Sequence, residues 1–214
     1  MAEEEIVLHY SVASRSLTAL WMLEELGLVY RLVDRDLRTT KNRSPDYLRL
    51  NPMGTVPTLV VGEVVVSENP AICLYLADRY GYGSLAPRIE EADRGAYLKW
   101  MVYSTAVLEP AVALAGATLD YGAKGPPRNW GPNWGDADDV VRVLTQALEG
   151  RDYLLGSRFS AADVMLGSSL GMRLFTGMLP AAPVLVAYNE RLEARPARQR
   201  AGAITWPASL FPAA

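Results

Sequence analysis

The stretch LHYSVASRSLTALWMLEELGL, residues 8–28, decides the fold of the first part of this chain. Apolar residues lead into a turn rich in hydroxyl groups, and leucines then recur at helical spacing until Gly27. This pattern predicts a strand at Ile6–Tyr10 and a helix at Ser16–Leu26. The first N–H groups of a helix lack intrahelical partners and carry a partial positive charge. The corner between strand and helix is therefore suited to hold an anion.

The composition indicates a globular protein with small-molecule ligands. Half of the 214 residues are apolar, and the net charge is −3 without long runs of like charge, so we expect no nucleic-acid partner and no membrane anchor. No apolar run reaches the roughly 18 residues of a membrane span, and the N-terminus is acidic, which predicts a cytoplasmic protein. Cys73 and His9 are the one cysteine and the one histidine, so we expect neither an internal disulfide nor a metal site.

The pattern changes after residue 80. Before it we expect further strands and a second strong helix, at Tyr30–Leu37, Thr58–Val61, Val64–Val66 and Glu68–Tyr80, with a short helix among them. This order predicts a thioredoxin-like α/β domain over residues 1–82. A linker follows, and residues 88–214 are expected to form an all-α domain, with helices at Glu90–Leu119, Ala137–Glu149, Ala161–Phe175 and Val184–Glu193. Residues 121–136 are too rich in Gly and Pro to be regular, and the apolar tail 201–214 is expected to pack onto the body.

Three blocks carry a family resemblance. The quoted stretch with its SRS sequence at 14–16, and LNPMGTVPTLVVGEVVVSENPAICLYLADRY at 50–80, resemble the N-terminal domain of cytosolic glutathione S-transferases of bacterial type. FSAADVMLG at 159–167 resembles a helix start in that family's C-terminal domain. The resemblance implies a homodimeric enzyme of detoxification that binds glutathione as a cosubstrate, without a metal. Its thiolate would then be conjugated to a small, apolar electrophile.

Two other functions stay open on the same fold. One is a non-catalytic scaffold or ligand carrier that binds glutathione without turning it over. The other is a glutathione-dependent reductase or lyase.

Ser14 is the first catalytic candidate and Ser11 the second. The resemblance places Ser14 where a serine hydroxyl hydrogen-bonds the glutathione sulfur, and Arg15 adds a cation beside it. Lowering a thiol pKa by ~2 units requires about 2.7 kcal/mol, which one charged hydrogen bond and a helix N-terminus could supply together. The alternative is that Ser14 or Ser16 only caps the helix. Arg15 stands where some bacterial members carry a catalytic cysteine, which argues against cysteine-type chemistry.

Two further segments are candidates for glutathione binding. The resemblance implies a cis Val56-Pro57 bond, with the backbone of Val56 pairing with the cysteinyl part, whereas the residues alone leave open a trans proline at a strand start. Glu68-Asn69-Pro70 is a strong helix start, and Glu68 could pair with the ligand's ammonium while Asn69 and the helix end hold its carboxylate. The alternative for Asn69, where relatives more often have serine, is capping alone.

The remaining candidates are weaker. Many relatives have Lys or Arg at Thr55, so the cation for the glycine carboxylate must come from elsewhere, and Lys41 is a weak candidate. One face of the long helix could line a second-substrate pocket, although the same spacing is typical of core: Tyr97, Trp100, Met101 and Ser104. Ser160 and Asp163 form a close variant of the capping box, to which we assign a role in folding only.

Overall fold

The computed structural model describes residues 4–116 and 135–207, and these form two compact units. One unit consists of the chain up to Ile89 together with the chain from Leu192 onward, and the other runs from Glu90 to Arg191. The expected irregular segment with its two tryptophans, and the end of the apolar tail, lie outside the described residues. Each unit is described by itself below.

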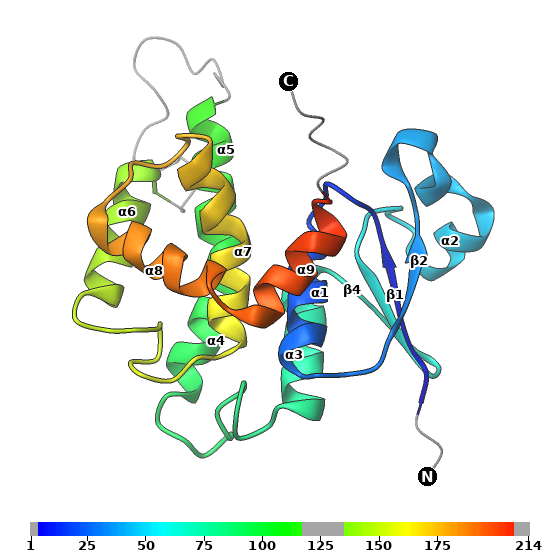
Figure 1. Ribbon diagram of the computed structural model, residues 1–214, viewed down its shortest axis with the longest axis horizontal. Helices are drawn as coiled ribbons and strands as arrows, with labels where there is room; N and C mark the ends of the chain where they lie inside the picture. Colours follow the sequence, from blue (N-terminus) through cyan, green and yellow to red (C-terminus); the bar gives the residue numbers. More distant parts are fainter. Residues whose placement is uncertain (1–3, 117–134, 208–214) are drawn as a thin grey trace. The chain divides into compact units, whose positions relative to one another are not determined.

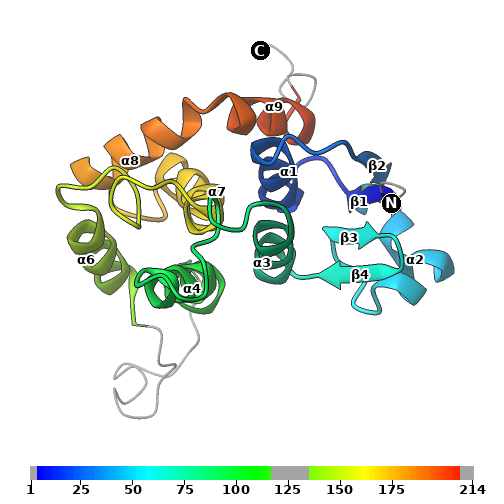
Figure 2. The same ribbon diagram turned by 90° about the horizontal axis from the view of Figure 1, so that it is seen from below.

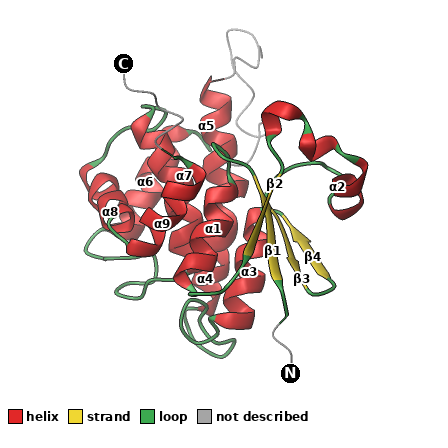
Figure 3. Ribbon diagram, turned by 45° about the vertical axis from the view of Figure 1, so that its right-hand side comes forward, coloured by secondary structure: helices red, strands yellow, loops and turns green. Residues whose placement is uncertain are grey.

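The first unit is organised around a four-stranded mixed sheet (Figure 3). The strands β1 and β2 are parallel, whereas β3 is antiparallel to both β1 and β4, which gives the order β2-β1-β3-β4. The bounds are Ile6–Tyr10 for β1, Arg31–Asp34 for β2, Thr58–Val61 for β3 and Val64–Ser67 for β4. The thioredoxin-like layer that the sequence predicts is confirmed.

Helices cover both faces of this sheet (Figure 1). Helix α1, Ser16–Glu25, and helix α3, Asn69–Tyr80, pack against each other on one face. Alternate residues of a strand point to opposite sides of the sheet. Leu8 of β1 points to the face covered by α1 and α3 and is fully buried there. The short helix α2, Pro45–Leu50, lies on the other side and starts with Pro at its first position.

A further helix of the first unit comes from the end of the chain. Helix α9, Pro196–Thr205, packs along α1 (Figure 2). Arg195 forms an ion pair with Glu25 of α1 at 2.6 Å, and Arg200 forms one with Glu24 at 2.6 Å. The sequence pattern predicts no helix here and groups these residues with the C-terminal domain.

The described part of the second unit consists of helices and connecting turns, with isolated β-bridges and no strand, as expected. Its helices are α4, Arg94–Tyr103, α5, Glu109–Gly116, α6, Ala137–Leu148, α7, Ala161–Phe175, and α8, Pro183–Glu193, the last of which ends just past the unit boundary. A π-helical turn, Ser104–Leu108, separates α4 from α5 where one continuous helix was expected. Pro110 follows this turn and has no N–H to bond back to the preceding turn, which accounts for the interruption.

The start of α7 has the capping box that the sequence predicts. The backbone N–H of Ser160 donates to Asp163 Oδ2 at 2.9 Å, and the Leu154 N–H and the Tyr188 hydroxyl both donate to Asp163 Oδ1 at 2.9 Å. Burial raises the pKa of Asp163, and these hydrogen bonds oppose that effect. The carboxylate therefore joins three segments of the second unit.

Candidate functional site

Helices α1 and α3 lie side by side in the first unit (Figure 2), and a hydrogen bond joins their N-terminal ends. The side-chain Nδ2 of Asn69 donates to the backbone carbonyl oxygen of Arg15 at 3.1 Å, although 54 residues separate the two positions. This hydrogen bond joins the turn before α1 to the first residue of α3. The structure thereby brings together the two segments that the sequence analysis singled out separately.

Ser14 lies in the turn just before α1 and is half-buried. Its Oγ donates to the carbonyl oxygen of Ser11 at 2.6 Å and accepts from the backbone N–H of Ser16 at 3.1 Å. The N-cap residue of α1 is Arg15, whose side chain makes no capping hydrogen bond. Ser14 is not the N-cap residue, yet its hydroxyl satisfies the first N–H of α1, so the capping alternative for Ser14 stays open beside the catalytic one.

Ser11 is set deeper than Ser14. It is 2% exposed, its N–H donates to Ser16 Oγ at 3.3 Å, and its Oγ accepts a long hydrogen bond from Leu37 N at 3.4 Å. A ligand atom can reach a half-buried hydroxyl more readily than a buried one. The geometry therefore favours Ser14, while the role of either serine stays a prediction.

The peptide bond between Val56 and Pro57 is cis, as the resemblance implies. The turn before it is held by the Thr55 carbonyl oxygen, which accepts from the Tyr47 hydroxyl at 2.5 Å and from Asn51 Nδ2 at 3.0 Å. Gly54 has φ +63°, and a Cβ at this position would lie 2.9 Å from Asn42 O. Only glycine therefore suits this turn.

Glu68 and Asn69 stand at the start of α3. Glu68 is exposed and has φ +69°, a conformation that is costly for a residue with a Cβ and is often found at functional sites. Asn69 is 6% exposed, and its Oδ1 has no hydrogen-bond partner among the described residues. Its Nδ2 is used on the Arg15 carbonyl, so Asn69 holds the start of α3 against the turn before α1.

Lys41 is exposed in the 3-10 turn Lys41–Arg43. The next residue, Asn42, donates to the carbonyl oxygen of Gly54 at 2.7 Å, which places this turn beside the one that precedes Pro57. Within the described residues Lys41 forms no ion pair. Its neighbouring cations all have partners: Arg35 pairs with Asp46, Arg38 pairs with Asp36, and Arg43 donates to the Met53 carbonyl oxygen. Lys41 is thus the cation of this loop that remains available to a ligand.

The four candidates for a second-substrate pocket lie in the second unit and are buried. Tyr97, Met101 and Ser104 are fully buried, and Trp100 is 5% exposed. Ser104 Oγ bonds Ser169 Oγ of α7 at 2.9 Å. These contacts agree with the core alternative, and a role in binding stays a prediction.

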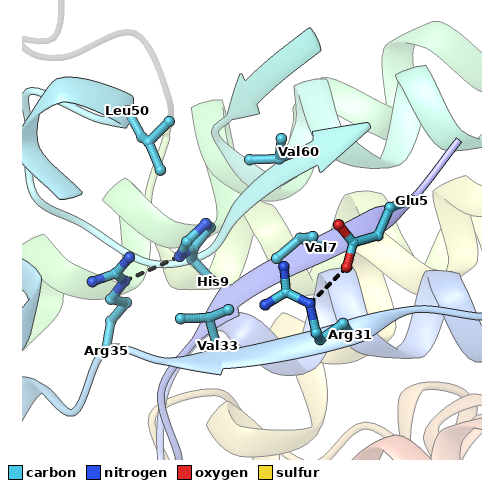
Figure 4. A pocket seen from close by; sticks show the side chains of 8 residues that line it. All are labelled: Glu5, Val7, His9, Arg31, Val33, Arg35, Leu50 and Val60. Carbon is cyan, nitrogen blue, oxygen red and sulfur yellow. Dashed lines mark hydrogen bonds and ion pairs between the residues drawn. The ribbon is translucent and has the colours of Figure 1, made fainter. Parts of the chain in front are cut away.

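A cavity of about 430 Å³ lies elsewhere, on the sheet face opposite α1 and α3 (Figure 4). No candidate site residue lines it; its lining is Glu5, Val7, His9, Arg31, Val33, Arg35, Leu50 and Val60. His9 Nδ1 accepts from Arg35 Nε at 3.0 Å, and burial, followed by the charges of Arg35 and Arg31, lowers the pKa of His9 to about 4. A neutral histidine that accepts a hydrogen bond from Arg35 on this face fits a structural role.

Residues 4–116 and 135–207 contain neither a candidate metal centre nor a candidate membrane span. They contain no cluster of three or more His, Cys, Asp or Glu suited to a metal ion, and none of their helices is both long and apolar enough to cross a membrane. Cys73 is fully buried, and burial raises the pKa of its thiol.

Comparisons with known proteins cover both units. A family model described as "Glutathione S-transferase, N-terminal domain" matches residues 14–79. Glutathione S-transferase 3 of Zea mays is 30% identical over 84% of this chain and 84% of its own length. The disulfide-bond oxidoreductase YfcG of Escherichia coli is 28% identical over 84% of this chain and 86% of its own. A solved theta class glutathione S-transferase of Xanthomonas axonopodis pv. citri with glutathione bound is 31% identical, has a TM-score of 0.69, and is matched over 92% of this chain and 97% of that one.

Proposed function

The chain belongs to the glutathione S-transferase family, and from this premise we propose that it binds glutathione where the N-termini of α1 and α3 meet. The observation that carries the proposal is the hydrogen bond from Asn69 Nδ2 to the Arg15 carbonyl oxygen. It sets a corner suited to a thiolate next to a helix start suited to an amino-acid group. Both ends of one small ligand could then be bound by a single site.

The thiol end is assigned to Ser14, with Ser11 in reserve. The hydroxyl of Ser14 and the partial positive charge at the start of α1 stabilise the anion relative to the neutral thiol, and Arg15 adds a positive charge nearby. In the reaction the sulfur attacks an electrophilic carbon of the second substrate and forms a C–S bond. A leaving group departs with its electron pair, or an added proton completes the product.

The γ-glutamyl end is assigned to Glu68 and Asn69. The carboxylate of Glu68 is an exposed acceptor, so it suits the ammonium group. The first N–H groups of α3 are donors and suit the carboxylate. This refines the expectation for Asn69, whose donor is already used within the chain.

We assign the cysteinyl part and the glycine end of the ligand to the turns that carry Val56 and Lys41. The backbone of Val56, just before Pro57, would pair with the cysteinyl part, as in the family. Lys41 would then supply the cation for the glycine carboxylate, because the other cations of its loop are engaged.

Conjugation to a small, apolar electrophile by a cytoplasmic homodimer, in detoxification, is the function we favour. A reductase acting on glutathione disulfides is the second candidate, because one relative is named a disulfide-bond oxidoreductase. Arg15 in place of a cysteine favours conjugation over thiol exchange. Rates with an activated aryl halide and with a mixed glutathione disulfide distinguish the two.

Calorimetric titration of glutathione into the full chain tests the proposal. We expect one site with heat of binding, and an absorbance band of the bound thiolate at neutral pH. S-methylglutathione is the matched control, because it keeps both charged ends and cannot ionise at sulfur. A flat titration with folded protein would exclude this site.

A further inference from the structure

The last residue of α9 is hydrogen-bonded to the turn that carries Ser14. The backbone N–H of Ala13 donates to the carbonyl oxygen of Thr205 at 2.7 Å. Carbonyl groups at the end of a helix have no intrahelical donor, so Ala13 supplies the missing partner. Thr205 is fully buried, and its hydroxyl donates to the carbonyl oxygen of Ala201 at 2.9 Å. The acceptor is therefore held firmly beside the turn.

Ala13 needs such a partner because its backbone is left-handed. Its φ is +51°, and the Cβ of an L residue disfavours this region. The described residues include three non-glycine positions with positive φ, and two of them, Ala13 and Glu68, lie at the proposed glutathione site. Since Ser14 follows Ala13 directly, the backbone angles of Ala13 set the direction of the Ser14 side chain.

The N-terminal end of α9 is joined by an ion pair to α1, the helix that follows Ser14. Arg195 donates from Nε and Nη2 to the two carboxylate oxygens of Glu25, at 2.6 and 2.7 Å. Trp21 Nε1 donates to Glu25 Oε1 at 2.8 Å and orients the same carboxylate. A two-point ion pair with a largely buried carboxylate fixes direction as well as distance. Helix α9 therefore bridges the C-terminal turn of α1 and the turn before its N-terminus.

From these contacts we infer that the C-terminal turn of α9 positions the thiolate-binding serine, with Thr205 as the positioning residue. Its carbonyl oxygen keeps Ala13 left-handed and thereby directs Ser14 Oγ at the glutathione sulfur. This inference rests on the proposed function. Weakening the hydrogen bond between Ala13 and Thr205 should then alter the pKa of the bound thiol and the turnover. The affinity for glutathione should change less, because the zwitterionic γ-glutamyl end of the ligand is bound at α3.

The sharpest test replaces the peptide N–H of Ala13 by an ester oxygen, through incorporation of lactic acid at this position. The change removes the donor and keeps the Cβ. We expect kcat at neutral pH to fall about three- to tenfold and the rising limb of the pH–rate profile to move to higher pH. The calorimetric Kd for glutathione should stay within about twofold. An ester at Ala86 is the matched control, because its N–H donates to the Gly81 carbonyl oxygen at 3.1 Å in the same unit.

A second variant acts through the other end of the helix. Arg195→Met removes the ion pair with Glu25, whereas Gln199→Ala changes an exposed residue of the same helix. We expect Arg195→Met alone to raise the pKa of the bound thiol, in protein whose circular dichroism shows it to be folded.

The outcomes are separable. Wild-type protein that binds no glutathione would overturn the proposed function and this inference together. If wild type binds glutathione and turns it over, an ester variant with unchanged kcat and pH profile would overturn the inference alone. So would a variant with weaker binding and an unchanged thiol pKa, because that result indicates a general structural role.

Discussion

Ser14 has a single hydroxyl proton, and it lies between two acceptors, Ser11 O at 2.6 Å and Ser16 Oγ at 2.9 Å. To donate to a thiolate, Ser14 must exchange one of these neutral bonds for a charged one. A charged hydrogen bond contributes about 1.5–3 kcal/mol and a neutral one about 0.5–1.5 kcal/mol. The net stabilisation of the anion by this residue is therefore about 1–2 kcal/mol, which is less than the charged bond alone suggests.

This exchange sets the size of the effect expected for Ser14→Ala. The pKa of the bound thiol should rise by about 1 unit and kcat at neutral pH should fall about threefold, with the Kd for glutathione nearly unchanged. Thiolate absorbance as a function of pH measures the first quantity. Ser11→Ala is the matched control, and a larger shift in that variant would transfer the role to Ser11.

For Asn69 we expect a change in the affinity for glutathione and not in the pKa of its thiol. Asn69→Ala removes the bond that holds the start of α3 against the Arg15 carbonyl, so the Kd for glutathione should rise about tenfold. The pKa of the thiol in the bound ligand should change little, because the sulfur lies at α1. Asn69→Ser should recover most of the affinity, since serine also donates and accepts. Calorimetry on the three proteins checks this, and equal affinities would remove Asn69 from the site.

At the scale of elements, the capping box before α7 separates folding from function. Ser160→Ala should lower the free energy of unfolding by about 0.5–2 kcal/mol. Asp163→Ala should lower it by about 3–5 kcal/mol, because the N–H groups of Leu154 and Ser160 and the Tyr188 hydroxyl would lose their acceptor in a buried place. Urea denaturation measures both values. Neither variant should change the Kd for glutathione while folded, and a selective loss of binding would contradict the assignment to folding.

Most elements could be predicted from local signals. The strand Thr58–Val61 and the helix Ala161–Phe175 have the expected bounds, because turn residues and a capping box mark their ends. Helix α9 was missed because its sequence, PARQRAGAIT, has few apolar residues to show a helical period. The signal that could have revealed it is Pro196 at the first helical position.

The candidate site was also predictable only in part, because some of its features lack a local sequence signal. Ser14, Glu68 and Asn69 lie at helix starts that the sequence marks. The partnership of Ala13 with Thr205 and the left-handed backbone of Ala13 have no local signature, because alanine is an ordinary helix residue. Contacts between distant segments decide them, and a single sequence does not display such contacts.

At the scale of the whole molecule, the grouping of the chain end with the first unit follows from charge pairs over long separations. Glu25 pairs with Arg195 across 170 residues, and Glu24 with Arg200 across 176. Composition alone places residues 192–207 with the helical region that precedes them. The ion pairs and the packing of α9 on α1 instead join them to the α/β unit.

The stability of the molecule should depend on pH through His9. In the folded state its pKa is lowered to about 4 by burial and by the charges of Arg35 and Arg31, which outweigh the opposing charge of Asp46. In the unfolded state the pKa is about 6.5. Between these values the unfolded chain binds the extra proton, so the stability held above pH about 6.5 is lost as the pH falls toward 4. The loss from this residue is about 3 kcal/mol.

His9→Asn isolates this contribution, because an asparagine oxygen can accept from Arg35 Nε in place of Nδ1 and does not titrate in this range. The wild type should lose about 3 kcal/mol more than the variant between pH 7 and pH 4, which urea unfolding at the two pH values measures. Gln199→Ala, at an exposed residue of the same unit that does not titrate, is the control and should follow the wild type. Equal losses in wild type and His9→Asn would mean that the pKa of His9 is the same in the folded and unfolded states. His9 would then be protonated at pH 4 in the folded protein and would lose its hydrogen bond from Arg35 there, because a protonated Nδ1 cannot accept.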